Sequence, residues 1–354
     1  MRSPALRHAL THLIAPLLMC LGMGLAYMGA FVTPEPHQLP VAVVGGAPEA
    51  KALAGAVQDS AGDKLDVRTV DTRAEAVDLL KSRAITGAYV PDAKSPELVV
   101  ATASSDMGAL AVQRVFTPLA AEQGLPLKVT DAVPPVADDP SGQGLFFLLI
   151  AVSIGSYASV AAIGAAGGAL PMRIRALLTL GVSAVVGGIG ALLAGPVFHL
   201  AHHGLAGVFG MAWLYSAGIL FIGLGLHTFL KRWTTLTMMV LFVMLNFTSS
   251  GGLFRPELQN GFFGTLHSFW NGAGFVEGAR GLLYFGGDGL ARNITTLAAW
   301  LLAGLALTAL AAVHERGREG APTVAAEPRT EVREDAGEEA GAEAEEEAEE
   351  TVGV

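Results

Sequence analysis

The chain has 354 residues, of which 52% are hydrophobic and only 15% are charged, and its mean hydropathy is +0.49. Soluble domains carry about 25% charged residues, so this composition argues against a soluble enzyme. Cys20 is the only cysteine, which excludes an intrachain disulfide and a cysteine-cluster metal site, and no basic, aromatic-interleaved surface indicates a nucleic-acid partner.

Charge divides the chain into four parts. Residues 1–32 carry a formal charge of +2, residues 33–140 carry −6, and residues 141–314 carry +4. Residues 315–354 contain 14 acidic against four basic residues, so the whole net charge of −10 equals that of this C-terminal part.

The first predicted element is an apolar helix over residues 10–31, expected to be an N-terminal transmembrane helix. The run from Leu13 to Val32 contains no charged residue, and a bilayer core about 30 Å thick requires about 20 apolar helical residues. A cleaved signal peptide is the alternative, because Arg2 and Arg7 precede the apolar stretch. We favour an uncleaved anchor, since the run exceeds the usual signal core of about 7–15 residues.

Residues 33–140 are predicted to form an α/β domain, because the apolar period changes to short buried runs separated by amphipathic segments. The acidic residues of this part are scattered over helix faces and turns, which indicates a solvated surface rather than a catalytic site. We expect strands at Val41–Val44, Leu65–Val70, Ile85–Val90, Glu97–Ala101 and Leu127–Thr130, and helices at Pro48–Ser60, Arg73–Arg83 and Asp106–Gln123.

The remaining uncharged runs predict a five-helix membrane domain over residues 141–314. The fold class is therefore a polytopic α-helical membrane protein with about six transmembrane helices. Lys and Arg are enriched in short cytoplasmic loops, so we expect both termini in the cytoplasm and residues 33–140 outside a cell membrane. Besides residues 10–31, the predicted spans are 144–168, 176–200, 208–230, 234–250 and 290–313.

His199 and His203 have the i, i+4 spacing that could hold a metal at the outer end of the third span. No cysteine or nearby acid completes such a set. We therefore predict no metal site, and expect these histidines to reach water at the headgroups.

Residues 251–289 are too interrupted to form a simple span. The sequence Ser249-Ser250-Gly251-Gly252 breaks the fifth span, and Pro256 fits the opening of a short helix. A second short helix is expected from Gly274 to Tyr284, where Glu277 and Arg280 have i, i+3 spacing and can pair. Irregular backbone at membrane depth requires cover by protein or water, so we expect a re-entrant or interfacial helical hairpin on the outer face.

Residues 315–354 are rich in Glu and Ala and hold almost no large apolar side chain beyond Val332. Such a segment cannot bury a core, and we expect an acidic disordered cytoplasmic tail. A solubilising extension is the main interpretation, and docking to a basic partner is the alternative.

With these residues in view, the chain resembles permease subunits of ABC transporters of the type-2 exporter class, in the branch that includes the phage infection protein. The resemblance extends to about residue 314. In that family the segment that corresponds to residues 249–287 forms short outer helices near the exit of the translocation path. The chain departs from the family at Trp270-Asn271-Gly272 and in its acidic tail. The most specific resemblance lies in Ser249, Ser250, Gly251, Gly252, Pro256, His267, Glu277, Arg280 and Gly281.

This resemblance implies a permease that exports an amphipathic or envelope-related substrate. The sequence lacks the phosphate-binding motif Gly-x-x-x-x-Gly-Lys-Ser/Thr, so energy would come from a separate ABC-type ATPase, and we expect no enzymatic activity and no cofactor. The resemblance also implies a homo- or heterodimer with another permease chain, embedded in membrane lipid. In the family the loop between the second and third spans contacts the ATPase, which makes Arg173 and Arg175 coupling candidates. Their alternative role is to set orientation.

Two other functions remain open. One is a non-transporting membrane scaffold, an accessory protein for secretion that binds a partner through its outer domain. The other is a membrane enzyme, for which the nearest approach to a catalytic pair is His267 with Glu277 in a broken helical segment.

Overall fold

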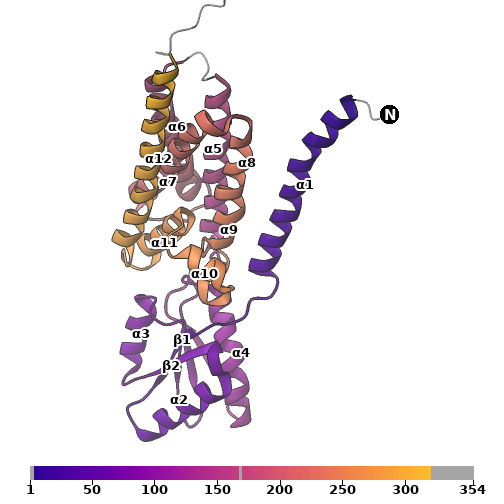
Figure 1. Ribbon diagram of the computed structural model, residues 1–354. Coiled ribbons are helices and arrows are strands. Elements are labelled where there is room, and N and C mark those ends of the chain that lie inside the picture. The colour runs from indigo at the N-terminus through magenta and orange to yellow at the C-terminus, as the bar shows by residue number, and fades with distance from the viewer. Residues whose placement is uncertain (1–3, 167–169, 320–354) are drawn as a thin grey trace, which may run out of the picture.

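The computed structural model describes residues 4–166 and 170–319. It consists of a bundle of long helices with a five-stranded α/β domain at one end (Figure 1). Most of the acidic tail lies outside the described residues, and its expected disorder stays a prediction.

The α/β domain contains one mixed sheet with strand order β2-β1-β3-β4-β5. Strand β1 pairs in parallel with β2 and β3, β4 runs antiparallel to β3, and β5 runs parallel to β4. Every predicted strand and helix of this part is present, with ends within two residues of those expected. The strands are β1 (Leu39–Val44), β2 (Leu65–Val70), β3 (Gly87–Val90), β4 (Glu97–Val100) and β5 (Lys128–Asp131), and the helices are α2 (Pro48–Ala61), α3 (Arg73–Lys81) and α4 (Asp106–Glu122).

Both faces of the sheet are covered, because successive side chains of a strand point to opposite faces. Leu39 and Val41 of β1 pack with residues of α2 and α4, and Tyr89 stacks on Phe116 of α4 with ring centroids 5.0 Å apart. Ala42 faces the other side, in a cluster with residues of α3. The domain therefore has a core of its own on each face of the sheet.

Helix α7 is the central element of the bundle, with an almost continuous buried stretch from Tyr215 to Gly225. It contacts α5, α6, α11 and α12. Large apolar side chains are exposed on α1, α5, α6 and α12, as a lipid-facing surface requires. The long helices are α1 (Pro4–Phe31), α5 (Gly144–Ala166), α6 (Met172–Leu192), α7 (Leu205–Leu230) and α12 (Leu290–Glu319), and the shorter α8 (Thr234–Met239) and α9 (Leu245–Ser249) follow α7.

Within the described residues, five helical segments are long and apolar enough to cross a membrane, which is consistent with a polytopic membrane protein. The predicted spans 208–230 and 234–250 both fall in one of them, the 45-residue segment Leu205–Ser249. Within that segment α7 ends at Leu230, and Lys231 takes a positive φ of 48° before a short 3-10 turn leads into α8. The five segments are Leu13–Phe31, Gly144–Gly164, Met172–Val197, Leu205–Ser249 and Leu290–Arg318.

The third predicted span extends too far at its C-terminal end. Helix α6 continues as a π-helical turn, Leu193–Val197, which contains Pro196, and the chain then leaves the helix at His199 with φ 50°. Proline removes a backbone donor and disfavours continuation of the helix. His199 and His203 therefore do not share a helix face, and their i, i+4 spacing does not place their side chains next to each other.

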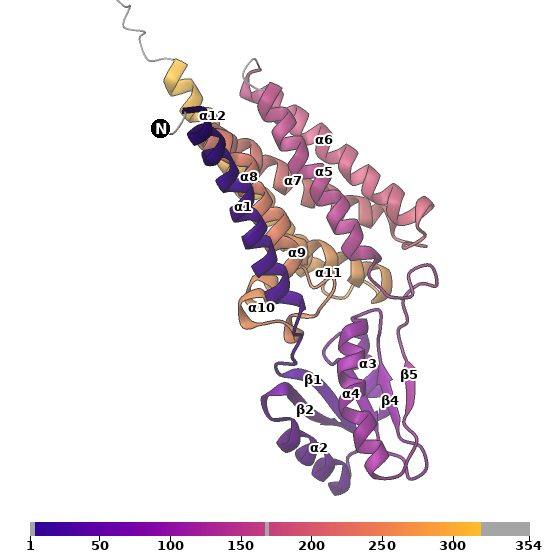
Figure 2. The same ribbon diagram turned by 90° about the vertical axis from the view of Figure 1, so that its right-hand side faces the viewer.

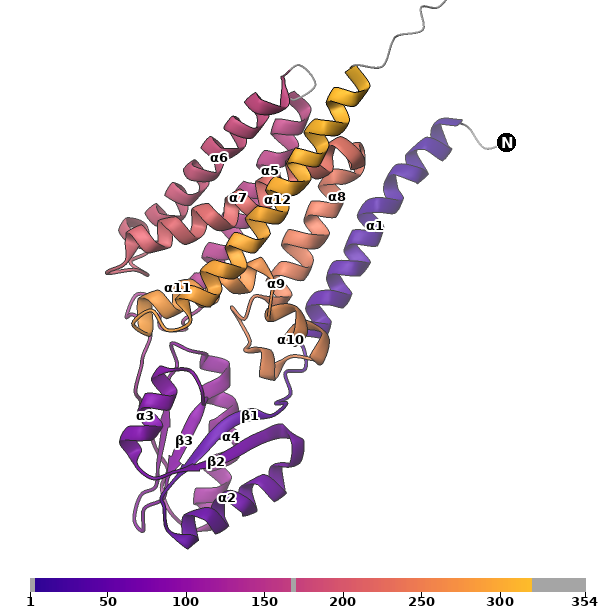
Figure 3. The same ribbon diagram turned by 60° about the vertical axis from the view of Figure 1, so that its left-hand side comes forward.

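Helix α1 lies beside the bundle and joins it at one end. Figure 3 shows its N-terminal half standing apart from α8, and Figure 2 shows its other end close to α10 (Gly261–His267). At this end Phe31 stacks on Phe254 with centroids 5.6 Å apart, and Asn260 Nδ2 donates to Gly29 O at 3.1 Å. The end of α1 is thus tied to the segment that follows α9.

Candidate functional site

The candidate site lies where the α/β domain meets the helix bundle. A cavity of about 450 Å³ is lined by the end of α3, the segment around Pro256, the helices α10 and α11 (Asn271–Tyr284), and the start of α12. The first short helix was expected to open at Pro256, but Pro256 opens only a 3-10 turn, Pro256–Leu258, and α10 begins at Gly261. The second short helix begins at Asn271 rather than at Gly274.

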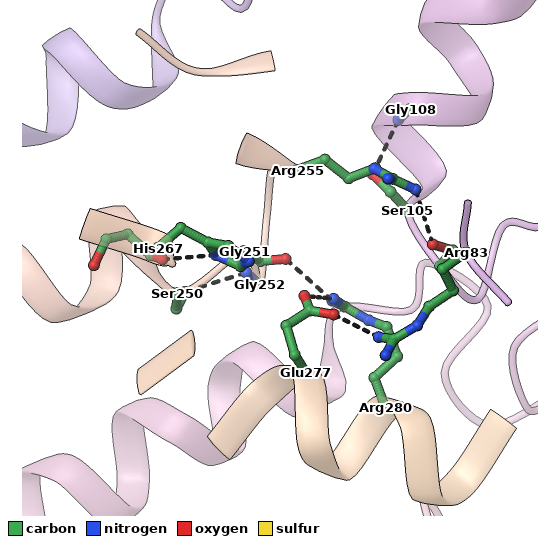
Figure 4. A network of polar contacts seen from close by, with 12 residues as sticks. Arg83, Ser105, Gly108, Ser250, Gly251, Gly252, Arg255, His267, Glu277 and Arg280 are labelled. Carbon is green, nitrogen blue, oxygen red and sulfur yellow. Dashed lines mark hydrogen bonds and ion pairs between the residues drawn. The ribbon is translucent and has the colours of Figure 1, made fainter. Parts of the chain in front are cut away.

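Glu277 of α11 is the centre of a polar network at this junction (Figure 4). Arg280 Nη1 donates to its Oε1, which is the predicted i, i+3 pair. Arg83 Nη1 donates to its Oε2 at 2.6 Å. Arg280 Nη2 also donates to Gly251 O at 3.2 Å. The carboxylate of Glu277 therefore compensates two guanidinium groups that are 4% and 14% exposed.

Arg83 is the residue of this network that the sequence analysis missed. It follows α3 with a φ of 58°, and its Nη2 donates to Asp288 O at 3.1 Å. Its guanidinium lies over the ring of Phe285, 5.5 Å from the centroid. Arg83 thus holds the α/β domain to both α11 and the turn before α12. Neither helix periodicity nor local spacing could reveal a contact across 194 residues.

The turn after α9 fits closely around this network. Gly251 has a φ of 72°, and a Cβ at this position would lie 2.6 Å from His267 Cε1 and 2.9 Å from Glu277 Oε1. His267 Nδ1 makes a hydrogen bond of 3.0 Å with Ser249 O, and Gly252 N donates to Ser250 Oγ at 3.1 Å. The turn therefore requires glycine for both conformation and space.

Gly281 has a related role on α11. A Cβ at this position would clash with Asp288 O, so the close approach of α11 to the turn before α12 depends on glycine. Of the nine residues expected at the hairpin, the structure joins Ser249, Gly251, His267, Glu277 and Arg280 by hydrogen bonds or close contact, and Pro256 lines the same cavity.

Ser250, Gly252 and Gly281 lie beside this group, and among the described residues none of the three makes a hydrogen bond to the Glu277 side chain. A role of the nine in a gate stays a prediction.

Opposite charges outweigh burial at Glu277. Burial alone would raise the pKa of its carboxyl group, but the positive charge of Arg280, followed by His267, Arg83 and Arg255, holds that pKa below its usual range. The pKa of Glu257 is lowered in the same way, because Arg255 outweighs the effect of burial. Both acids are therefore ionised near neutral pH.

Arg255 makes a second connection, in the opposite direction. Its Nε and Nη2 donate to Glu257, each at 3.1 Å, and its Nη1 donates to Ser104 Oγ at 3.3 Å, just before α4. Glu257 O in turn accepts from His37 N at 2.7 Å. One arginine from each side thus crosses the junction.

A buried polar cluster lies within the bundle, away from the junction. Tyr215 OH is 2.6 Å from Ser153 Oγ and accepts from Asn246 Nδ2 at 2.7 Å. Asn246 Oδ1 and both polar side-chain atoms of Asn271 have no hydrogen-bond partner among the described residues. The sequence analysis did not single out this cluster, because its members come from separate helices.

The coupling candidates lie at the other end of the bundle. Arg173 is exposed at the start of α6, whereas Arg175 is 7% exposed and donates through Nη2 to Glu315 Oε2. The structure therefore separates the two arginines: Arg173 is exposed, and Arg175 is buried and paired with Glu315.

Comparisons with known proteins add no family. No protein-family model, curated protein or solved structure matches the chain. Within residues 4–166 and 170–319, no group of three or more His, Cys, Asp or Glu residues is arranged to hold a metal ion.

Proposed function

We propose that the chain is the membrane-spanning permease subunit of an exporter driven by a separate ABC-type ATPase, and that it moves an amphipathic or envelope-related substrate outward. The observation that carries this proposal is the network of Arg83, Glu277 and Arg280. It couples an α/β domain at one end of an apolar helix bundle to a helical hairpin within that bundle. An exit gate requires such a mechanical connection between the membrane part and the part outside.

The proposed topology has six crossings, with both termini in the cytoplasm and the α/β domain outside. The turn at Lys231 supports it, because α7 ends there and α8 and α9 lead back toward the α/β domain (Figure 1). The segment Leu205–Ser249 would then cross twice. Lys and Arg gather at the opposite end of the bundle, as expected for a cytoplasmic side.

In this proposal the hairpin of residues 251–289 acts as the outer gate. The Ser249–Gly252 turn and α11 move together, because Arg280 joins Glu277 to Gly251 O. The α/β domain follows through Arg83. A shift of α11 would therefore carry both the Ser249–Gly252 turn and the α/β domain with it, while the ion pairs of Glu277 stay intact.

The ATPase would bind at the end of the bundle opposite the α/β domain. Exposed Arg173 is the better coupling candidate, since Arg175 is already occupied by Glu315. A second permease chain, identical or related, would complete the path through the membrane.

A non-transporting membrane scaffold is the second candidate. One observation favours it: the centre of the bundle is closed by α7 and by the cluster of Tyr215, Ser153 and Asn246. In that case the α/β domain, held rigidly by Arg83 and Arg255, would serve as the binding surface for a secretion partner.

Affinity purification of the intact protein from its native membrane separates the two. If the chain is a permease, a stoichiometric ABC-type ATPase should copurify with it, and the rate of ATP hydrolysis by that ATPase should change on binding the chain. Arg173→Gln should weaken this change. Arg114→Gln, an exposed arginine on α4, is the matched control. Recovery of secretion or envelope proteins without any ATPase would overturn the permease proposal and favour the scaffold.

A further inference from the structure

A second cavity, of about 670 Å³, lies at the end of the bundle opposite the α/β domain. Its walls come from the start of α6, the end of α7 and the last turns of α12, three elements that meet at this end of the bundle (Figure 1). The proposed transport function does not explain this cavity.

The cavity is strongly basic. Its only acidic lining residue within the described ranges is Glu315, and both of its carboxylate oxygens already have partners: Arg175 donates to Oε2, and Thr228 Oγ1 donates to Oε1 at 2.9 Å. Among residues 4–166 and 170–319, no other acidic side chain lines the cavity to balance its positive charge. The cationic residues that line the cavity are Arg173, Arg175, Lys231, Arg316 and Arg318.

Arg175 supplies a second, independent observation that points to an anionic ligand. Its side chain is 7% exposed and lines the cavity, yet its Nε has no hydrogen-bond partner among the described residues. A buried charged donor without an acceptor is costly, and an anion with several oxygen acceptors would relieve that cost. Arginine forms such hydrogen bonds to phosphate in a directed, often bidentate way.

The surroundings of the cavity are those of a membrane interface. The residues Phe229, Trp233 and Val313 are close in sequence to residues that line the cavity, and they are 43%, 49% and 66% exposed. The guanidinium of Arg232 lies over the Trp233 ring at 5.4 Å. Exposed aromatic and basic residues at the ends of apolar helices are typical of headgroup depth. An anion that arrives here with acyl chains could lay them along the exposed apolar sides of α6 and α12.

From these observations we infer that this cavity binds the phosphate headgroup of an anionic membrane lipid. Arg175 bounds the phosphate site on the buried side, and Lys231 and Arg316 neutralise the phosphate from the rim. Basic pockets between membrane helices are suited to such headgroups. The inference is independent of transport, because a scaffold with the same bundle would hold the same lipid.

The test is native mass spectrometry of the full chain in detergent, titrated with phosphatidylglycerol and, separately, with phosphatidylcholine of the same acyl chains. Lys231 and Arg232 provide a matched pair, since they are neighbours of equal charge and only Lys231 lines the cavity. We expect Lys231→Gln to weaken binding of phosphatidylglycerol about tenfold, the loss of one charge-assisted hydrogen bond. Arg232→Gln should leave it within about twofold.

Arg316→Gln on α12 is the second variant, because it tests the same cavity from another element if Lys231→Gln disturbs the turn after α7. Preference for phosphatidylglycerol over phosphatidylcholine, lost on Lys231→Gln or Arg316→Gln but kept on Arg232→Gln, supports the inference. Equal losses of phosphatidylglycerol affinity in Lys231→Gln and Arg232→Gln would indicate general electrostatic attraction to the surface and would overturn the inference. Displacement of the bound lipid by millimolar inorganic phosphate would also overturn it, since the site would then be one for soluble phosphate.

Discussion

Arg83 and Glu277 are 194 positions apart in the chain, and their side chains meet at 2.6 Å between Nη1 and Oε2. The contact joins the end of α3 to the middle of α11. Because Glu277 also accepts from Arg280, one carboxylate pairs with an arginine from each side of the junction, and Asp288 Oδ2 lies 3.6 Å from Arg83 Nε as a second counter-charge. Loss of this single group would therefore affect both parts of the molecule.

Replacement of Glu277 by Ala should leave Arg280 buried without its counter-charge and lower the free energy of unfolding by about 3 kcal/mol. Export in reconstituted membranes should fall more than membrane insertion does. Thermal unfolding in detergent and a protease-protection assay of insertion measure the two effects. Glu122→Ala, on the exposed surface of α4, is the control. Equal losses of export and insertion would make the network a folding element only.

Gly251→Ala should destabilise the protein by more than Gly124→Ala, although both glycines have a φ near 70°. The backbone strain is therefore similar, about 1 kcal/mol or more in each case. A Cβ at Gly124 meets open space, whereas one at Gly251 meets His267 and Glu277. The difference between the two melting temperatures reports the fit of the hairpin turn. Equal shifts would show that the turn tolerates a side chain.

Stability should depend on pH through Glu97, whose side chain accepts two hydrogen bonds from Arg73. The hydrogen bond from Arg73 lowers the pKa of Glu97 to about 2, from the value of 4.5 for a free glutamate side chain. A depressed folded pKa means that the stabilisation is complete above about pH 4.5 and is lost as the pH falls toward 2.

Arg73→Gln should therefore lower the melting temperature at neutral pH and converge with the unsubstituted chain near pH 2. Arg114→Gln, the exposed arginine of α4, serves as the control with the same charge change. A difference between Arg73→Gln and the unsubstituted chain that persists unchanged at pH 2 would contradict the pairing.

Tyr215→Phe should lower the free energy of unfolding by about 1–2 kcal/mol, because Ser153 Oγ and Asn246 Nδ2 both lose a partner in a buried site. Tyr157→Phe, a half-buried tyrosine of α5, is the control. Urea titration in mild detergent provides the measurement. Equal urea midpoints for Tyr215→Phe and the unsubstituted chain would show that water satisfies the side chains of Ser153 and Asn246 when the tyrosine hydroxyl is absent.

Features formed by residues a few positions apart in the chain were predicted well from the sequence. Short runs such as Leu65–Val70 are bounded by turn residues and carry the two-residue period of a strand, and α11 brings Glu277 and Arg280 to one face by its own geometry. The paired small residues at Ser249–Gly252 likewise indicated a break. These features depend on neighbours within a few positions.

Contacts between distant elements could not be predicted in this way. Nothing in the sequence near Arg83 indicates that it turns toward α11, and Tyr215 and Asn246 look like ordinary members of apolar spans. The end of α6 was predicted wrongly because Pro196 sits in an otherwise apolar run, where hydropathy outweighed the missing backbone donor. The break between the spans 208–230 and 234–250, by contrast, was predicted from the charges of Lys231 and Arg232, and α7 does end at Leu230.

The α/β domain is attached to the bundle at four separate places: its N-terminal end follows α1, its C-terminal end leads into α5 where Asp139 Oδ2 accepts from Gly144 N, and Arg83 and Arg255 cross the junction between them. Two of these attachments are covalent, and the other two are arginine side chains that cross the junction in opposite directions. A displacement of the hairpin would therefore act on the domain through the chain at its two ends and through these side-chain contacts between them.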